Sequence, residues 1–141
     1  MARKNLYLDH LRQVPLFSAC TDKDLTKIAR AGDEVTVPDG HVIVDQGQTG
    51  REAFVIMSGN VVVRRNGKKV ATVGPGAVIG ELSLFDHGPR TATCTAEGEV
   101  TLFVLDQRHF AAVIDEVPAI AHKIMASMAA KIREFDRQHF G

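Results

Sequence analysis

The sequence predicts an α+β domain in which an antiparallel β-roll of the jelly-roll type is flanked by helices at both ends. Residues 34–106 alternate short β-rich runs with glycine turns, which is typical of an antiparallel sandwich or barrel. Residues 5–32 and 107–140 instead place apolar side chains at helical spacing. A length of 141 residues suits one domain with one core, so we expect a single domain over residues 1–141.

Residues 5–32 form the expected N-terminal helical segment. Pro15 interrupts the first apolar pattern. Thr21 and Asp24 have the spacing of a capping box, with Asp in place of the usual Glu, so a second helix is expected to begin there. Gly32 is expected to end that helix.

The central region predicts short strands, with turn signals at intervals of about 8–12 residues. The pair Asn66-Gly67 is the strongest hairpin signal in the chain. The expected strands are residues 34–37, 41–45, 53–57, 60–65, 68–73, 91–96 and 100–105.

The C-terminal segment predicts a short helix over residues 108–114 and a longer one that begins at Pro118, a residue suited to a first helical turn. One apolar stripe runs along the longer helix at steps of three and four. The first half of the stripe is expected to pack on the roll. The whole stripe also suggests that two copies of the chain form a homodimer through this C-terminal helix, as a short coiled coil. The stripe is Ile120, Ala121, Ile124, Met125, Met128, Ile132 and Phe135.

Charge and hydropathy argue against several classes of protein. Lys plus Arg is 17 and Asp plus Glu is 17, so the formal net charge is +0, whereas a domain built to bind nucleic acid usually carries a basic excess. No apolar run approaches the roughly 20 residues of a membrane-spanning helix, and no apolar signal core follows the first residues. We therefore expect a cytoplasmic protein with no nucleic acid and no membrane as partner.

A metal or catalytic site is not expected. Cys20 and Cys94 form no CxxC pair, which argues for two free thiols. No two histidines have the HxH spacing with which a cupin-type metal site begins. The sequence also contains no recognisable Ser-His-Asp or Cys-His nucleophile arrangement. We expect no enzyme activity, no metal and no cofactor, and a cupin-type enzyme is the rival that a metal assay would test. The histidines are His10, His41, His87, His109, His122 and His139.

Residues 76–93 form a connection between strands that is longer than a structural turn needs. Gly80 lets the backbone approach a ligand closely, and a single helical turn after it can direct N–H groups at an anion. Glu81 can accept a hydrogen bond from a ribose hydroxyl, Ser83 adds a donor, and Arg90 offers a planar fork to two phosphate oxygens. Each residue alone would be an ordinary surface charge, cap or turn. Together they predict a site for a small cyclic phosphate diester.

This segment resembles the phosphate-binding cassette of cyclic nucleotide-binding domains, the family of the catabolite activator protein and the regulatory subunits of cAMP-dependent protein kinase. The resemblance rests on Gly80-Glu81-Leu82-Ser83-Leu84, a short spacer and Pro89-Arg90-Thr91-Ala92, and it extends over nearly the whole chain. It implies that Glu81 binds the ribose and Arg90 the phosphate. The ligand-binding residues that it implies in and beside the cassette are Val78, Ile79, Gly80, Glu81, Leu82, Ser83, Arg90, Thr91 and Ala92.

The resemblance leaves the nucleotide open between cAMP and cGMP. Thr91 directly follows the arginine, and a threonine at this position resembles the members that prefer cGMP. Many members with Ser or Thr at this position nevertheless prefer cAMP, and we favour cAMP as the ligand. Asp136 in the last helix falls where the family often contacts the purine, and it can accept a hydrogen bond from either base. A solvated C-terminal charge is the alternative for Asp136.

The resemblance implies a switch rather than an enzyme. It implies that the ligand phosphate draws the cassette inward and that the helix from Pro118 then swings to cap the base. No helix-turn-helix, kinase or channel segment follows that helix, so we expect a stand-alone sensor that acts through an unknown downstream protein. The alternatives are a ligand-independent protein-interaction module with the same fold, against which Glu81 and Arg90 argue, and a DNA-binding regulator, against which the neutral charge argues.

Overall fold

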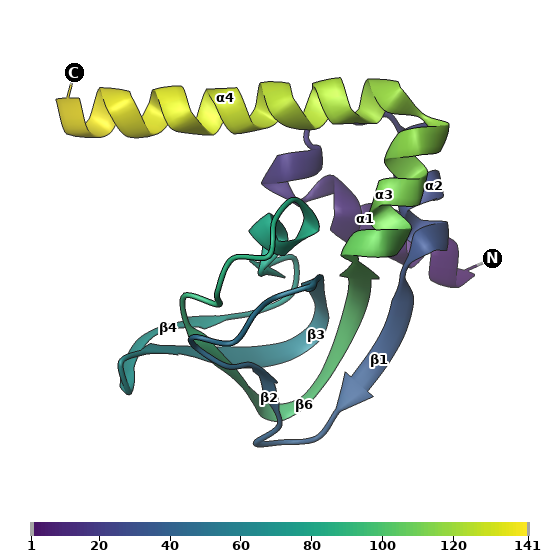
Figure 1. The fold of residues 1–141 in the computed structure, drawn as a ribbon. Helices are drawn as coiled ribbons and strands as arrows, with labels where there is room; N and C mark the ends of the chain where they lie inside the picture. The colour runs from purple at the N-terminus through teal and green to yellow at the C-terminus, as the bar shows by residue number, and fades with distance from the viewer. Residues whose placement is uncertain (1, 141) are drawn as a thin grey trace.

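Helices cover one end of a rolled, six-stranded antiparallel sheet (Figure 1). The structure is a computed structural model that describes the backbone of residues 2–140 and the side chains of residues 7–140. It confirms the predicted β-roll with helices on both sides of it in the sequence. The elements are α1 (Ala2–Arg12), the 3-10 helix η1 (Pro15–Phe17), α2 (Asp22–Ala31), β1 (Asp33–Val37), β2 (Val42–Val44), β3 (Glu52–Arg65), β4 (Lys68–Val73), β5 (Val78–Ile79), the 3-10 helix η2 (Glu81–Leu84), β6 (Thr93–Asp106), α3 (Gln107–Glu116) and α4 (Pro118–Phe140).

The strand β6 organises the sheet, because it pairs with β1, β2 and β3. The strand order is β1-β6-β3-β4, with β2 on β6 and β5 on β3. Strands β3 and β6 are continuous, so the sequence prediction of two separate strands in each place was wrong. Gly59 (φ 90°) and Gly98 (φ 75°) lie inside these strands, and β3 shifts register against β6 between Ile56 and Ser58 and between Ser58 and Asn60. Such bulges bend a strand without ending its pairing.

The helix α2 begins as predicted. Thr21 and Asp24 form a complete capping box, in which each side chain bonds the backbone N–H of the other. Gly32 ends the helix, but its backbone is extended (φ −109°, ψ 174°) rather than left-handed. Glycine is needed there for space, because a Cβ would lie 2.3 Å from the ring of Phe103.

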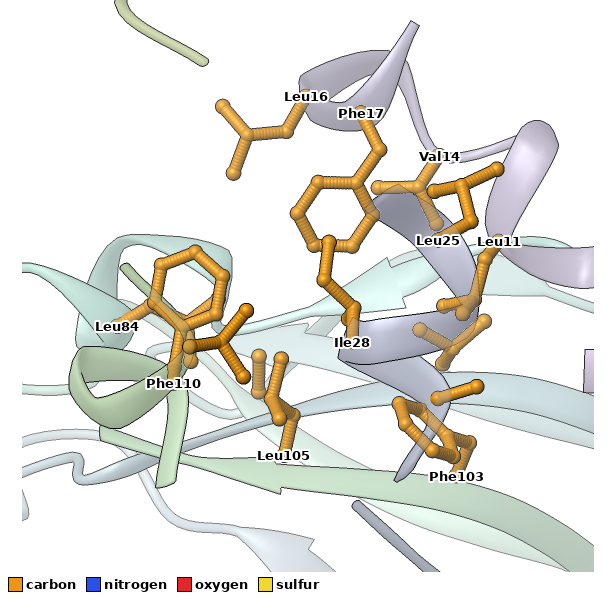
Figure 2. Close-up of a cluster of buried hydrophobic side chains, with 14 of the residues drawn as sticks. Leu11, Val14, Leu16, Phe17, Leu25, Ile28, Leu84, Phe103, Leu105 and Phe110 are labelled. Carbon is orange, nitrogen blue, oxygen red and sulfur yellow. The ribbon is translucent and has the colours of Figure 1, made fainter. Parts of the chain in front are cut away.

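The main hydrophobic core lies between the helices and the roll (Figure 2). Side chains from α1, η1 and α2 pack against Phe103 and Leu105 of β6. Leu84 of η2 and Phe110 of α3 belong to the same cluster, and Figure 2 shows them side by side. A second cluster fills the roll itself. The turn η2 is therefore joined to the helical layer through shared packing.

The helix α4 is attached to the molecule by its first half. Ile120 and Ile124 are buried, and the helix packs mainly on η1 and α3 rather than directly on the strands. Lys123 Nζ lies 2.5 Å from Asp24 Oδ2, and Ser127 Oγ lies 3.2 Å from Ser18 Oγ. The second half extends past the roll (Figure 1). Among residues 2–140 no helix has the length and apolar character to cross a membrane.

Candidate functional site

A tight turn at Gly80 leads from β5 into η2. Gly80 has φ 72° and ψ 33°, a left-handed conformation that glycine adopts readily. A Cβ at this position would lie 2.1 Å from Nη1 of Arg90, so glycine is also required by the close approach of the arginine. The single helical turn predicted after Gly80 is confirmed as η2, and it brings Ser83 to the guanidinium group.

Arg90 is half-buried beside this turn. Its Nη1 donates a hydrogen bond to Ser83 Oγ at 2.9 Å, and its Cζ lies 5.9 Å from the centre of the Phe54 ring. Burial lowers the pKa of the Arg90 guanidinium, and the charge of Glu52 opposes that shift. Within the described residues no carboxylate forms an ion pair with Arg90. A guanidinium with a hydroxyl as its side-chain partner retains donors for an anion.

The loop before β3 holds Arg90 in place through its backbone. Arg90 N donates to Gln48 O at 2.7 Å, Gly47 N donates to Arg90 O at 2.9 Å, and Gly50 N donates to Gly88 O at 3.3 Å. Gly50 also leaves room for the site, since a Cβ there would lie 2.3 Å from Ser83 Oγ and 2.6 Å from Arg90 Cζ. Sequence reasoning missed Gly50. Its signal, a glycine three residues after Gly47, does not show which side chain it faces.

Glu81 connects the cassette to α4. Its Oε1 lies 3.6 Å from Nζ of Lys131. That distance describes an ion pair rather than a good hydrogen bond, and both groups retain contact with solvent, with side-chain exposures of 52% for Lys131 and 30% for Glu81. Sequence reasoning did not find Lys131, because nothing in a helical charge pattern indicates which loop it approaches.

Two adjoining hollows lie on the cassette. One has a volume of about 550 Å³, and the side chains that line it include Glu81, Ser83 and Asp86. The other has a volume of about 190 Å³, and most of the residues that line it are apolar, Val44, Val63 and Val73 among them. They share Arg65, Val78, Gly80, Arg90 and Thr91. We call the first the polar hollow and the second the apolar hollow, after the residues that only one of them contains, and their volumes are in the size range of small-ligand sites.

The structure brings together nearly all the residues singled out in the sequence. Those that line one or both hollows are Val78, Ile79, Gly80, Glu81, Leu82, Ser83, Arg90, Thr91 and Ala92. Asp136 is exposed on α4 and lines neither hollow, so its contact with the base stays a prediction. Arg65, which sequence reasoning missed, reaches both hollows from the end of β3.

The thiols and potential metal ligands lie apart from one another. Cys20 and Cys94 are free, and burial raises the pKa of both thiols. Cys94 lines the apolar hollow. Over the part of the chain that the structure describes, no group of three or more His, Cys, Asp or Glu side chains is arranged to hold a metal ion.

Comparison with known proteins gives concordant matches. Residues 34–117 match the family model described as cyclic nucleotide-binding domain. The crystal structure of the N-terminal domain of a transcriptional regulator from Streptomyces coelicolor A3(2) superposes with a TM-score of 0.86 at 34% identity, covering 94% of this chain and 95% of that one. The regulatory domain of Toxoplasma gondii PKA, co-crystallised with cAMP, gives a TM-score of 0.73 at 29% identity over 79% of this chain and 44% of that one.

A curated relative is similar in sequence over most of this chain. The Cyclic AMP receptor protein of Thermus thermophilus is 30% identical over 127 residues, which are 86% of this chain and 59% of that protein. This chain thus spans less than two thirds of the length of that relative.

Proposed function

This chain belongs to the cyclic nucleotide-binding domain family, and from that premise we propose that it binds a 3′,5′-cyclic nucleotide in the two hollows and acts as a ligand-controlled sensor. We favour cAMP as the ligand and keep cGMP as the second candidate. The observation that carries the proposal is the half-buried Arg90, hydrogen-bonded to Ser83 Oγ and free of a carboxylate partner within the described residues.

The polar hollow suits the cyclic phosphate and the ribose. A cyclic phosphate diester has one negative charge, which one guanidinium balances, and the fork of Arg90 matches two phosphate oxygens. Ser83 and the N–H groups at the start of η2 add donors on the same side. Glu81 lines this hollow and is placed to accept a hydrogen bond from the ribose 2′-hydroxyl. No metal is needed to balance the charge.

The apolar hollow suits the purine. Its wall includes Val63, Val73 and Cys94, which can cover the faces of a flat ring. The names of two similar proteins, the receptor from Thermus thermophilus and the cAMP complex from Toxoplasma gondii, support cAMP. Thr91 lines both hollows and supports cGMP as the second candidate.

Glu81 gives the ligand a route to α4. The carboxylate that we assign to the ribose is the one that Lys131 contacts, so ligand and helix share one partner. A ligand shifts a conformational equilibrium by its difference in affinity for the two states, and a shared partner creates such a difference. Leu84 and Phe110 carry movement of the cassette to α3, because they pack in the same core. We propose that α4 then caps the base and that Asp136 or a neighbour contacts it.

The exposed part of α4 suits self-association. Met125, Ile132 and Phe135 are exposed and lie on the predicted stripe, whose steps of three and four match a coiled-coil seam. We propose a homodimer through α4. The downstream protein that would respond to the ligand is not identified by the geometry.

Calorimetry of the purified chain with cAMP, cGMP and 5′-AMP tests the proposal. We expect saturable binding of at least one cyclic nucleotide and far weaker binding of 5′-AMP, whose phosphate carries a second charge and is not held in a ring. If neither cyclic nucleotide binds, the sensor proposal is wrong, and a ligand-independent interaction module becomes the better explanation.

A further inference from the structure

Arg65 is the one residue shared by both hollows that comes from outside residues 78–91. The other four shared residues belong to β5, the turn at Gly80 and the end of the cassette, whereas Arg65 is the last residue of β3. It therefore reaches both hollows from a strand outside the cassette. No sequence motif assigns it a role.

The backbone around Arg65 is held in place. The next residue, Asn66, exchanges two hydrogen bonds with the Gln46 side chain, at 3.0 Å and 2.9 Å. Gln46 N in turn donates to Thr93 Oγ1 at 3.0 Å, where β6 begins after the cassette. The tip of the β3–β4 hairpin is thus tied to the segment that follows Arg90 and Thr91. This anchoring fixes the origin of the Arg65 side chain relative to the hollows.

The Arg65 guanidinium is available to a ligand. Within the described residues it forms no ion pair or side-chain hydrogen bond. The neighbouring Arg64 lies opposite Thr93 in the ladder and lines neither hollow, as expected when successive side chains point to opposite faces of a strand. Because Arg90 alone balances the single charge of a cyclic phosphate, the donors of Arg65 remain for neutral acceptors elsewhere on the ligand.

Apart from the ribose oxygens, the neutral acceptors of a cyclic purine nucleotide are on the base, and only these differ between cAMP and cGMP. Guanine presents O6 and N7 side by side as two acceptors, which an arginine fork matches in a bidentate manner. Adenine presents N7 beside the N6 amino group, which is a donor and repels the second N–H of the fork. The same arginine therefore interacts much better with guanine than with adenine.

We propose that Arg65 reads the O6/N7 edge of the purine and raises the affinity of the site for cGMP relative to cAMP. This inference rests on the proposed function, since it assumes a cyclic nucleotide with its base in the apolar hollow. It assigns a selectivity role to a residue outside the cassette. If the chain prefers cAMP, the other contacts of the site must outweigh the preference of Arg65 for cGMP.

Calorimetry on Arg65→Ala and on the matched control Arg64→Ala tests the inference. For Arg65→Ala we expect the affinity for cGMP to fall about tenfold and the affinity for cAMP to change less than about threefold, as for the loss of a bidentate guanine contact. Arg64→Ala should change neither affinity. The analogue 7-deaza-cGMP, which lacks the N7 acceptor, should lose less affinity than cGMP in Arg65→Ala.

Three results would overturn the inference while leaving the proposed function in place. The first is an equal loss of affinity for both nucleotides in Arg65→Ala, which would make Arg65 a second phosphate contact. The second is no change in affinity for either nucleotide in that variant. The third is a wild-type chain that binds cAMP but not cGMP. If the wild type binds neither nucleotide, the proposed function fails and the inference fails with it.

Discussion

The ammonium group of Lys131 on α4 lies 3.6 Å from the carboxylate of Glu81 on the cassette. One carboxylate therefore has two prospective partners, the helix and the ribose of the ligand. The first half of α4 is fixed separately, through Lys123 and Asp24. The Glu81–Lys131 pair is thus positioned to report on the ligand site without being needed for the attachment of the helix.

Replacing Lys131 with Ala should tighten the binding of the cyclic nucleotide about two- to threefold. The variant removes a competitor for Glu81, and an exposed ion pair contributes about 0.5 kcal/mol. Calorimetry with the 2′-deoxy cyclic nucleotide should show no such gain, because that ligand lacks the hydroxyl that competes with Lys131 for Glu81. Arg133→Ala, an exposed change on the same helix, is the control. Weaker binding by the Lys131 variant would contradict competition.

Replacing Arg90 with Ala should weaken binding at least about tenfold, since charge-assisted hydrogen bonds contribute about 1.5–3 kcal/mol. The fold should persist, because the arginine contacts a hydroxyl and the Phe54 ring and does not belong to either hydrophobic core. Calorimetry and thermal unfolding of the same preparation separate the two effects. An unchanged affinity in a folded variant would remove Arg90 from the site.

Replacing Gly50 with Ala should weaken binding about tenfold with little loss of stability. The backbone at Gly50 does not have a positive φ, but the added Cβ would press on Ser83 and Arg90. Gly67→Ala is the opposite control, since Gly67 has φ 79° and no atom within 4 Å of its Cβ position. That variant should lose about 1 kcal/mol of stability through backbone strain and keep its affinity. Equal effects of the two variants on affinity would contradict this assignment.

Replacing Asp24 with Asn should lower the free energy of unfolding at neutral pH by about 2 kcal/mol, because it breaks a nearly buried pair with Lys123. Burial raises the pKa of Asp24, but hydrogen bonds from Lys123 and Thr21 lower it further, so the net pKa is below the ordinary value. The stabilisation is therefore present above the ordinary pKa of about 4 and is lost as the pH falls through the lowered folded-state pKa.

Urea unfolding of the wild type and Asp24→Asn across the acid range checks this sign. The difference between the two proteins should be full at pH 7 and should shrink toward acid pH. A difference that is constant with pH would mean that the carboxylate charge of Asp24 is not what stabilises the attachment of α4.

Replacing Ile132 with Glu should abolish self-association through α4. The side chain is exposed on the apolar stripe, so the change costs little in the isolated chain but places a charge in a coiled-coil seam. Light scattering after size-exclusion chromatography gives the mass directly. Ala130→Glu, which adds the same charge at an exposed position on the opposite face of the helix from the stripe, should leave the mass unchanged. A wild type that is monomeric at high concentration would contradict the dimer.

The cassette was predictable because its parts are consecutive in the chain. Gly80, Glu81, Ser83 and Arg90 lie on one loop, so their order alone indicates a phosphate site. Gly50 and Lys131 reach the same loop from segments that only the tertiary fold brings near. Their contribution is a matter of distance in space, which a single sequence does not contain.

The strand boundaries show a second limit of sequence reasoning. A glycine with positive φ marks a turn in an isolated strand, and that rule is correct for Gly67 at the β3–β4 hairpin. Gly59 has the same conformation, yet the chain continues because β6 pairs with both sides of the bulge. Whether a glycine ends a strand therefore depends on its partner strand.

The way α4 is attached makes it a lever. Its fixed part reaches Ser127, and about 13 further residues to Phe140 extend about 20 Å at 1.5 Å per residue. A rotation of about 10° around the fixed part would move the far end by about 3–4 Å on that geometry. The same rotation moves Lys131, about 6 Å past Ser127, by about 1 Å. A shift of about 1 Å beside Glu81 can thus become a larger displacement at the end of α4, which a pair of fluorophores on α4 and the roll would register as a change in energy transfer.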